Sequence, residues 1–163
     1  MVFILMTFAV TEKGKRMIKE FVQAWDKNKN KLEEYFRTTK QEEYDEYEKI
    51  VKRLFDVVIN PEIDEGGYTS IFGFSYKFDT DKILVIDDGE YQGTQIFILH
   101  KKSYQPNVKE YVYTNAYYGS CTVCDTLQAI HCYDDGFPTQ QQVKDYMTLR
   151  LHLLQKCHYM KDE

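Results

Sequence analysis

Residues 83–100 read ILVIDDGEYQGTQIFILH, and this stretch decides the fold class. Two strand-like runs, Ile83–Ile86 and Gln95–His100, flank a polar segment that begins with Asp87-Asp88-Gly89-Glu90 and ends at Gly93. Asp and Gly in such a cluster are typical of tight turns. Because the connection has the length of a hairpin loop, and parallel strands need long crossovers, the stretch predicts two antiparallel strands.

Further strands are expected on both sides of this hairpin. In residues 72–78, rings at Phe72, Phe74, Tyr76 and Phe78 alternate with other side chains, which places them on one face of a strand. We expect turns at Asp79-Thr80-Asp81 and Gln105-Pro106-Asn107, followed by a Tyr-rich strand over residues 111–117. The middle of the chain therefore predicts an antiparallel meander rich in Tyr and Phe.

Helical patterns precede this sheet. Apolar residues recur at helical spacing in residues 18–25, 32–36 and 44–58. Three interruptions are expected: a turn at Asp26–Asn30, a capping box at Thr39 and Glu42, and a stop at Asn60-Pro61.

Helical patterns also follow the sheet. A short helix is expected from Asp125 to Ile130, and a capping box at Thr139 and Gln142 begins a longer one. Strands grouped between helices predict the α+β class. We expect a single domain over residues 1–163, with a helical part at about 11–60 and the sheet and C-terminal helix at about 68–160. The predicted core residues are Ile50, Leu54, Phe72, Phe74, Phe97, Leu151 and Leu154.

Charge separates the middle of the chain from the rest. The 21 Lys and Arg residues and 26 Asp and Glu residues give a net charge of −5, and residues 61–100 hold two basic and eight acidic residues. Such acidity argues against general nucleic-acid binding, which depends on Lys and Arg at phosphates. The basic residues between Lys27 and Lys40 alternate with glutamates, which is typical of a solvated helix face.

The acidic turns are the candidate partner-binding site. Taken singly, each of these residues fits a solvated turn, whereas together they would attract a partner with a basic surface. The candidate residues are Asp79, Asp81, Asp87, Asp88, Glu90 and Tyr91. Calcium binding is a weaker interpretation, because Asp79-Thr80-Asp81 lacks the Gly and the closing Glu of an EF-hand loop.

The motif Cys121-Thr122-Val123-Cys124 stands between a predicted strand and a predicted helix. Three interpretations stay open: small, partly buried residues in a tight corner, which we favour, a zinc site, or a redox dithiol whose thiol pKa is lowered at a helix start. A zinc site needs four ligands. The candidate metal ligands are Cys121, Cys124, His131, Cys132, Cys157 and His158.

Membrane, export and catalytic patterns are weak. Met1–Val10 is the only long apolar run, whereas a bilayer span needs about 20 residues, and basic residues follow this run instead of preceding it. We therefore expect reduced thiols, a cytoplasmic location and no membrane contact. The four histidines are scattered, and the chain has no GxSxG, HExxH or GxxxxGK[ST] motif, so we predict no catalytic residues and no cofactor other than zinc.

Two segments carry a resemblance. IDDGEYQGT at residues 86–94 and YGSCTVCDTLQAI at residues 118–130 resemble segments of a set of small uncharacterised bacteriophage and prophage proteins. The similarity extends to QVKDYMTL at residues 142–149 and LHL at residues 151–153, and it covers about half of the chain, from about residue 83 onward. It implies a phage context and a location in the host-cell cytosol, and it supplies no catalytic residues.

Together these observations favour a non-enzymatic protein–protein interaction module of phage type. We expect it to be an inhibitor of a host defence system (anti-CRISPR-like) that docks on a basic partner surface. The alternative is a small zinc-binding or thiol-redox protein built around Cys121 and Cys124. The sequence leaves the identity of the partner and the oligomeric state open.

Overall fold

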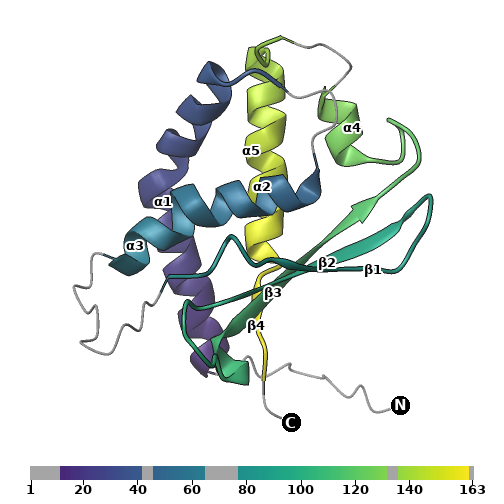
Figure 1. Ribbon diagram of the computed structural model, residues 1–163. Coiled ribbons are helices and arrows are strands. Elements are labelled where there is room, and N and C mark those ends of the chain that lie inside the picture. The colour runs from purple at the N-terminus through teal and green to yellow at the C-terminus, as the bar shows by residue number, and fades with distance from the viewer. Residues whose placement is uncertain (1–11, 42–45, 65–76, 132–135, 162–163) are drawn as a thin grey trace, which may run out of the picture.

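The computed structural model describes residues 12–41, 46–64, 77–131 and 136–161 (Figure 1). The helices are α1 (Glu12–Thr38), α2 (Tyr47–Leu54), a π-helical turn (Phe55–Ile59), α3 (Asn60–Asp64), a 3-10 turn (Val108–Glu110), α4 (Thr126–His131) and α5 (Gln140–Gln155). The strands are β1 (Leu84–Asp87), β2 (Gly93–His100), β3 (Tyr111–Tyr118) and β4 (His158–Tyr159). The expected α+β class is confirmed, because helices precede and follow the strands along the chain.

The sheet has the order β1-β2-β3-β4, and every neighbouring pair is antiparallel. The predicted hairpin of β1 and β2 is present, with Leu84 opposite Ile98 at its open end and Asp87 opposite Gln95 next to the connecting loop. β4 has only two residues and was not predicted, because it has no periodic pattern of its own and forms only by pairing with Val112 and Tyr113.

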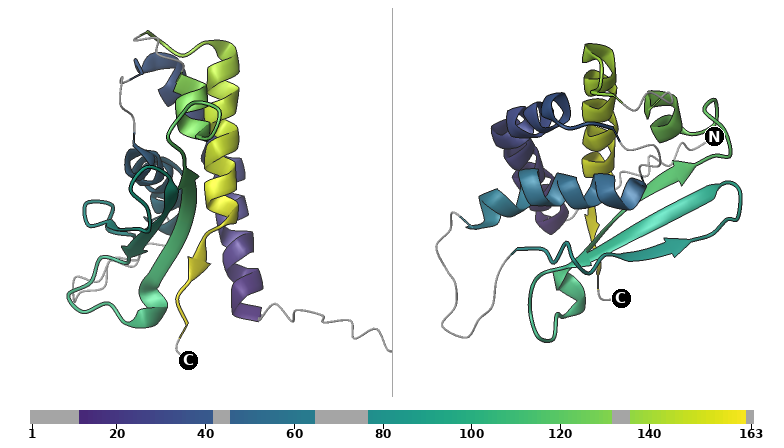
Figure 2. Two further views of the ribbon diagram at one scale, coloured as in Figure 1. Left: turned by 90° about the vertical axis from the view of Figure 1, so that its right-hand side faces the viewer. Right: turned by 45° about the horizontal axis from the view of Figure 1, so that its top comes forward.

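Helices cover one face of the sheet. Figure 2 shows α1 and α5 together on one side of it, and α2 crosses near α5. Phe97, Leu99 and Val112 point to this side and are fully buried. The Thr114 hydroxyl, also buried, donates a hydrogen bond of 2.7 Å to the Leu153 carbonyl of α5. The alternation of the strands therefore sets which face packs against the helices.

The core agrees with most of the predicted residues. Ile50, Leu54, Phe97 and Leu154 are buried, as predicted, whereas Phe72 and Phe74 lie outside the described residues. Leu151 is partly buried and packs against the edge of this core. Arg150 takes the central position instead, with its guanidinium carbon 3.9 Å from the Phe36 ring centroid. Stacking on an aromatic ring allows a guanidinium to occupy a position that the apolar pattern assigns to a hydrophobic residue.

The expected turn at Asp26–Asn30 is wrong, because α1 continues through it. Buried Asn28 explains the difference. Its amide donates to the Ala24 carbonyl within the helix, to the Val58 carbonyl, and at 2.6 Å to the Glu62 carboxylate. A polar residue that looks like a turn former therefore serves as a contact between α1 and the α2–α3 segment.

The expected helix stop at Asn60-Pro61 is also wrong. The π-helical turn Phe55–Ile59 lies between α2 and α3, and the Asn60 N–H bonds to the Phe55 carbonyl five residues back. Pro61 is the second residue of α3 and directly follows the π-helical turn and Asn60. The chain thus continues as a helix to Asp64.

Two expected capping boxes differ in outcome. The box at Thr139 and Gln142 is confirmed, because the Thr139 hydroxyl accepts from the Gln142 N–H and the Gln142 side chain accepts from the Thr139 N–H. Glu42 lies outside the described residues, and the next described helix begins at Tyr47.

Of the strand expected at 72–78, only Lys77 and Phe78 are described, and Phe78 bridges to Lys101. Across the described ranges, no helix has the length and hydrophobicity needed to cross a bilayer.

Candidate functional site

Two segments meet at one end of the sheet. The acidic loop, residues 87–93, joins β1 to β2, and the cysteine corner, residues 119–125, follows β3. Gly93 pairs with Tyr118 across the β2–β3 ladder. The Tyr118 hydroxyl donates a hydrogen bond of 2.8 Å to the Asp87 carboxylate, which raises the pKa of Tyr118 to about 12. The acidic loop and the cysteine corner are therefore joined side by side.

The carboxylates at the start of the acidic loop also shape it. Asp87 accepts hydrogen bonds from the Gln95 amide at 2.9 Å and from the Gly89 N–H at 3.0 Å. These bonds and the Tyr118 hydroxyl lower the pKa of Asp87. Asp88 accepts from the Thr94 N–H. The loop conformation is thus held by hydrogen bonds to the Asp87 and Asp88 carboxylates.

Glycine is required at two points of the acidic loop. A Cβ atom on Gly89 would lie 2.1 Å from the Gln92 carbonyl oxygen, and one on Gly93 would lie 2.6 Å from an Asp88 carboxylate oxygen. Both distances are far inside van der Waals contact. The backbone therefore folds back on itself so closely that only glycine fits, and this compactness projects the side chains between the two glycines outward.

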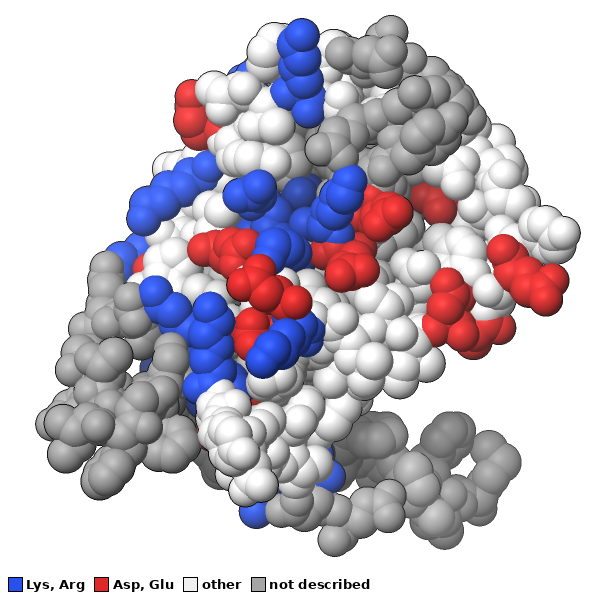
Figure 3. Space-filling view, in the orientation of Figure 1, with Lys and Arg blue, Asp and Glu red and all other residues white. Residues whose placement is uncertain are grey.

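Negative charge at the acidic loop is not balanced by neighbours. Among the residues that the structure describes, no basic side chain forms an ion pair with Asp87, Asp88 or Glu90. Figure 3 shows acidic side chains over the β1–β2 end at the right edge, surrounded by uncharged surface, whereas acidic and basic side chains alternate in the centre. The loop is a local source of negative potential.

Exposed apolar side chains border the acidic loop. Tyr91 is 79% exposed, and Tyr117 of β3 is 52% exposed. On β1, Leu84 and Ile86 point away from the buried face and are 58% and 46% exposed. Leu84, Ile86 and Tyr117 were not among the residues predicted for this site. The strand alternation contains the signal for them, since these residues stand on the face opposite Phe97 and Leu99.

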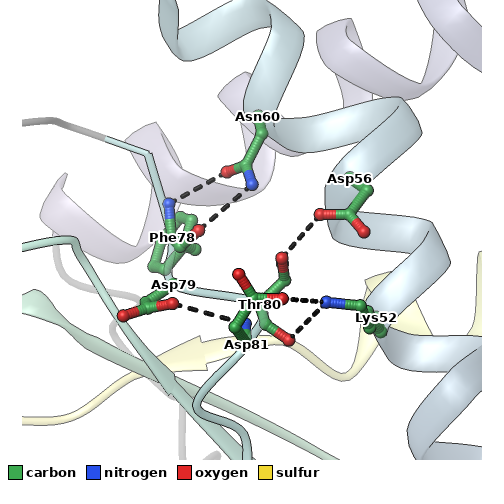
Figure 4. A network of polar contacts seen from close by, with 7 residues as sticks. All are labelled: Lys52, Asp56, Asn60, Phe78, Asp79, Thr80 and Asp81. Atoms are coloured by element: carbon green, nitrogen blue, oxygen red, sulfur yellow. Dashed lines mark hydrogen bonds and ion pairs between the residues drawn. The ribbon is translucent and has the colours of Figure 1, made fainter.

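Asp79 and Asp81 lie at the other end of β1, in a separate network (Figure 4). Asp81 pairs with Lys52 of α2 at 2.6 Å, which lowers the pKa of Asp81 and raises that of Lys52. Asp79 is buried, accepts from the Asp81 N–H at 3.3 Å, and lies 3.5 Å from the Lys82 ammonium. The six candidate partner-binding residues therefore form two groups.

The same network fixes the chain on both sides of this turn. The buried Asn60 amide accepts from the Phe78 N–H at 2.9 Å and donates to the Phe78 carbonyl at 3.1 Å. The Thr80 hydroxyl donates to the Asp56 carboxylate at 2.6 Å, and Lys52 donates to the Thr80 carbonyl at 3.0 Å. The turn is attached to the α2–α3 segment and is structural in character.

Asp125 organises the cysteine corner. Its buried carboxylate accepts from the Gly119 N–H and the Gln128 N–H, both at 3.0 Å, and from the Tyr47 hydroxyl at 3.1 Å. The Tyr47 oxygen also accepts from the Leu127 N–H. Burial is the main cause of a strongly raised pKa at Tyr47, which therefore stays protonated as a donor to Asp125. The corner is thus connected to α2 through one buried carboxylate.

Cys121 and Cys124 are exposed, with their sulfur atoms 3.1 Å apart. The interpretation of these two as partly buried residues is wrong, because the corner packs through Gly119 and Asp125 instead. A Cβ on Gly119 would lie 2.5 Å from the Cys124 Cβ. The Cys121 carbonyl accepts from the N–H groups of Cys124 and Asp125, both at 2.9 Å, so the backbone turns tightly between the two thiols.

The two thiols differ in acidity. The hydrogen bond with Cys124 is the main cause of a lowered pKa at Cys121, and the N–H groups of Val123 and Cys124 lower it further. The pKa of Cys124 is raised, first by its hydrogen bond to Cys121 and then by the Cys121 charge. Cys121 is therefore the thiol that ionises first.

The other candidate metal ligands do not join these thiols. Cys157 is buried beside α5, where burial raises its pKa to about 12, and His158 is on β4 opposite Tyr113. His131 is buried at the end of α4, and Cys132 lies outside the described residues. In the part of the chain that the structure describes, no three His, Cys, Asp or Glu side chains are grouped to hold a metal ion. Zinc binding stays a prediction.

Comparison of the chain with protein-family models, with curated proteins and with solved structures found no match.

Proposed function

We propose that the protein is a non-enzymatic interaction module of phage type that binds a basic protein surface through its acidic loop. The observation that carries the proposal is the uncompensated negative charge of Asp87, Asp88 and Glu90 beside the exposed Tyr91 ring. Charge complementarity of this kind accelerates association and selects basic partners.

The composition of the surface supports contact with a protein. Tyrosine is enriched among residues that contribute most to binding, because it buries a large ring and keeps a hydroxyl for hydrogen bonding. Tyr91 and Tyr117 supply such rings, and Leu84 and Ile86 continue the apolar surface along β1. The hydrogen bonds of Asp87 and Asp88 hold the loop in place, so that little conformational entropy is lost on binding.

The class of the partner is proposed from the phage resemblance together with the charge of the acidic loop. A carboxylate cluster on a rigid loop presents negative charge as nucleic-acid phosphates do, and it fits a channel lined with Lys and Arg. We propose that the partner is a nucleic-acid-binding protein of host defence, such as an RNA-guided nuclease, and that the protein acts in the host cytosol as an anti-CRISPR-like inhibitor.

The test is competition for a basic channel. Purified full-length protein is titrated into complexes of RNA-guided nucleases with their target DNA, and the concentration that releases half of the DNA is measured. Replacing three loop acids by Asp87→Asn, Asp88→Asn and Glu90→Gln should raise this concentration at least about tenfold, because it removes the charge and keeps the oxygen atoms that accept from Gly89, Thr94 and Tyr118.

A matched control removes the same charge elsewhere. Asp26, Glu34 and Glu48 are exposed acids on α1 and α2. Changing them to Asn, Gln and Gln should leave competition unchanged. Equal losses of competition in both variants would show that the effect depends only on net charge and not on the acidic loop. Wild-type protein that displaces no DNA from any such nuclease would exclude this partner class.

A further inference from the structure

We propose that Cys121 and Cys124 form a reversible dithiol that exchanges with disulfides, in which Cys121 attacks and Cys124 resolves. This activity goes beyond the proposed docking function and does not depend on it. The sulfur–sulfur distance of 3.1 Å and the exposure of both side chains carry the inference.

The geometry of the corner suits a disulfide. Its bond length is about 2.05 Å, so the sulfur atoms need to approach by only about 1 Å. The turn that brings them together is fixed by the two hydrogen bonds to the Cys121 carbonyl and by the close packing of Gly119 against Cys124. Because neither thiol is buried, an external disulfide can reach them directly.

The roles of the two cysteines follow from their surroundings. A thiolate is the nucleophile in disulfide exchange, and Cys121 ionises more readily because the Cys124 thiol and the N–H groups of Val123 and Cys124 stabilise its charge. Cys124 keeps its proton until Cys121 has reacted. The asymmetry predicts one order of attack.

The reaction balances with a disulfide as the oxidant. The Cys121 thiolate attacks one sulfur of a disulfide substrate, the substrate S–S bond breaks, and the leaving thiolate takes up a proton. Cys124 then loses its proton and attacks the Cys121 sulfur of the mixed disulfide, which releases the second substrate thiol. Two electrons pass from the cysteine pair to the substrate, which is reduced to two thiols while Cys121 and Cys124 form a disulfide.

Cys157 provides an internal control. Its side chain is 2% exposed, its sulfur donates to the Leu153 carbonyl at 3.4 Å, and burial raises its pKa to about 12. It should therefore stay unreacted in the folded protein while the corner thiols react.

The test uses full-length protein with Cys132→Ser, which leaves the pair and Cys157 as the only thiols. The protein is equilibrated with reduced glutathione and glutathione disulfide at a series of ratios, quenched with acid, alkylated, and analysed by peptide mass spectrometry. We expect a Cys121–Cys124 disulfide that forms and is lost reversibly as the ratio changes, with Cys157 fully alkylated only after unfolding.

Single variants test the order of attack. Cys124→Ser should accumulate a glutathione mixed disulfide at Cys121, and Cys121→Ser should react with glutathione disulfide on the order of tenfold more slowly at neutral pH. Circular dichroism melting shows that each variant is folded. The proposal is overturned by a pair that stays reduced at every ratio, by faster reaction at Cys124 than at Cys121, or by one tightly held zinc ion per chain that blocks alkylation.

Discussion

The two acidic turns at the ends of β1 use the same residue types in opposite ways. In the first, Asp79 is buried and Asp81 pairs with Lys52, so both charges are compensated within the fold. In the second, Asp87 and Asp88 bind only neutral groups of their own hairpin and of Tyr118, and their charge faces solvent. The first turn attaches the sheet to the helices, whereas the second leaves its charge available to a partner.

The difference lies in which element faces each turn. Lys52, Asp56 and Asn60 come from the α2–α3 segment and form hydrogen bonds with Asp81, Thr80 and Phe78, respectively (Figure 4). The acidic loop extends beyond these helices at the edge of the molecule (Figure 1). Whether an acidic turn can bind a partner therefore depends on whether other elements of the same protein pack on it and compensate its charge.

The largest contrast concerns one aromatic residue beside each turn. Phe78 is fully buried, with its ring 5.2 Å from Phe55 in an edge-to-face arrangement, whereas Tyr91 is 79% exposed. Phe78→Ala should lower the free energy of unfolding by roughly 3–5 kcal/mol, because it leaves a cavity. Tyr91→Ala should change it by less than about 0.5 kcal/mol. Urea unfolding measures both, and similar values for the two would remove the contrast.

The buried amide next to Phe78 should have the second largest effect. Asn60→Ala leaves the Phe78 N–H and carbonyl without their partner, which should cost roughly 2–4 kcal/mol. The matched control is Asn30→Ala, at an exposed position of α1, where we expect a change below about 0.5 kcal/mol. Chemical unfolding of both variants provides the measurement, and a loss no larger at Asn60 than at Asn30 contradicts the structural role of this network.

The ion pair of the first turn predicts a pH dependence. The folded pKa of Asp81 is lowered, so the stability it contributes is complete above its ordinary pKa and is lost as pH falls through the lowered value. Lys52→Met should raise the pKa of Asp81 toward its ordinary value and leave Asp87 unchanged, because Asp87 is held by Gln95, Gly89 and Tyr118. Carboxyl-carbon NMR titration measures both pKa values, and equal shifts at the two residues would show that the turns are coupled.

The smallest effect on stability is expected at the acidic loop. The triple variant Asp87→Asn, Asp88→Asn and Glu90→Gln keeps the oxygen atoms that accept from Gly89, Thr94 and Tyr118. Its free energy of unfolding should differ from that of the wild type by less than about 0.5 kcal/mol. Thermal melting monitored by circular dichroism checks this, and a loss of several degrees would assign the loop a structural role like that of the first turn.

Sequence patterns predicted the parts of the fold that depend on neighbours in the chain. The β1–β2 hairpin, the antiparallel meander and the Thr139 capping box each require only local residues. The continuity of α1 depends on Asn28 contacting Val58 and Glu62, more than 29 residues away, and no local pattern contains that information. Arg150 in the core likewise depends on the Phe36 ring from another helix.

The sequence indicated the acidic and cysteine residues of the candidate site, but it did not indicate which of them lie together in the fold. Acidic and cysteine motifs are visible in the sequence, but their meeting depends on the register that sets Gly93 opposite Tyr118. The separation of Asp79 and Asp81 from the acidic loop depends on Lys52, which lies on a helix 27 and 29 residues earlier in the chain. Contacts between distant segments decide both outcomes.

The association rate with a basic partner tests the central claim most directly. The rate constant for binding of the protein to an RNA-guided nuclease is measured at low and at physiological salt, for the wild type, the acidic-loop variant and the Asp26, Glu34 and Glu48 control. We predict that the loop variant associates more slowly at low salt and loses most of the salt dependence, while the control keeps both. Identical rates for the loop variant and the wild type at every salt concentration would contradict the account.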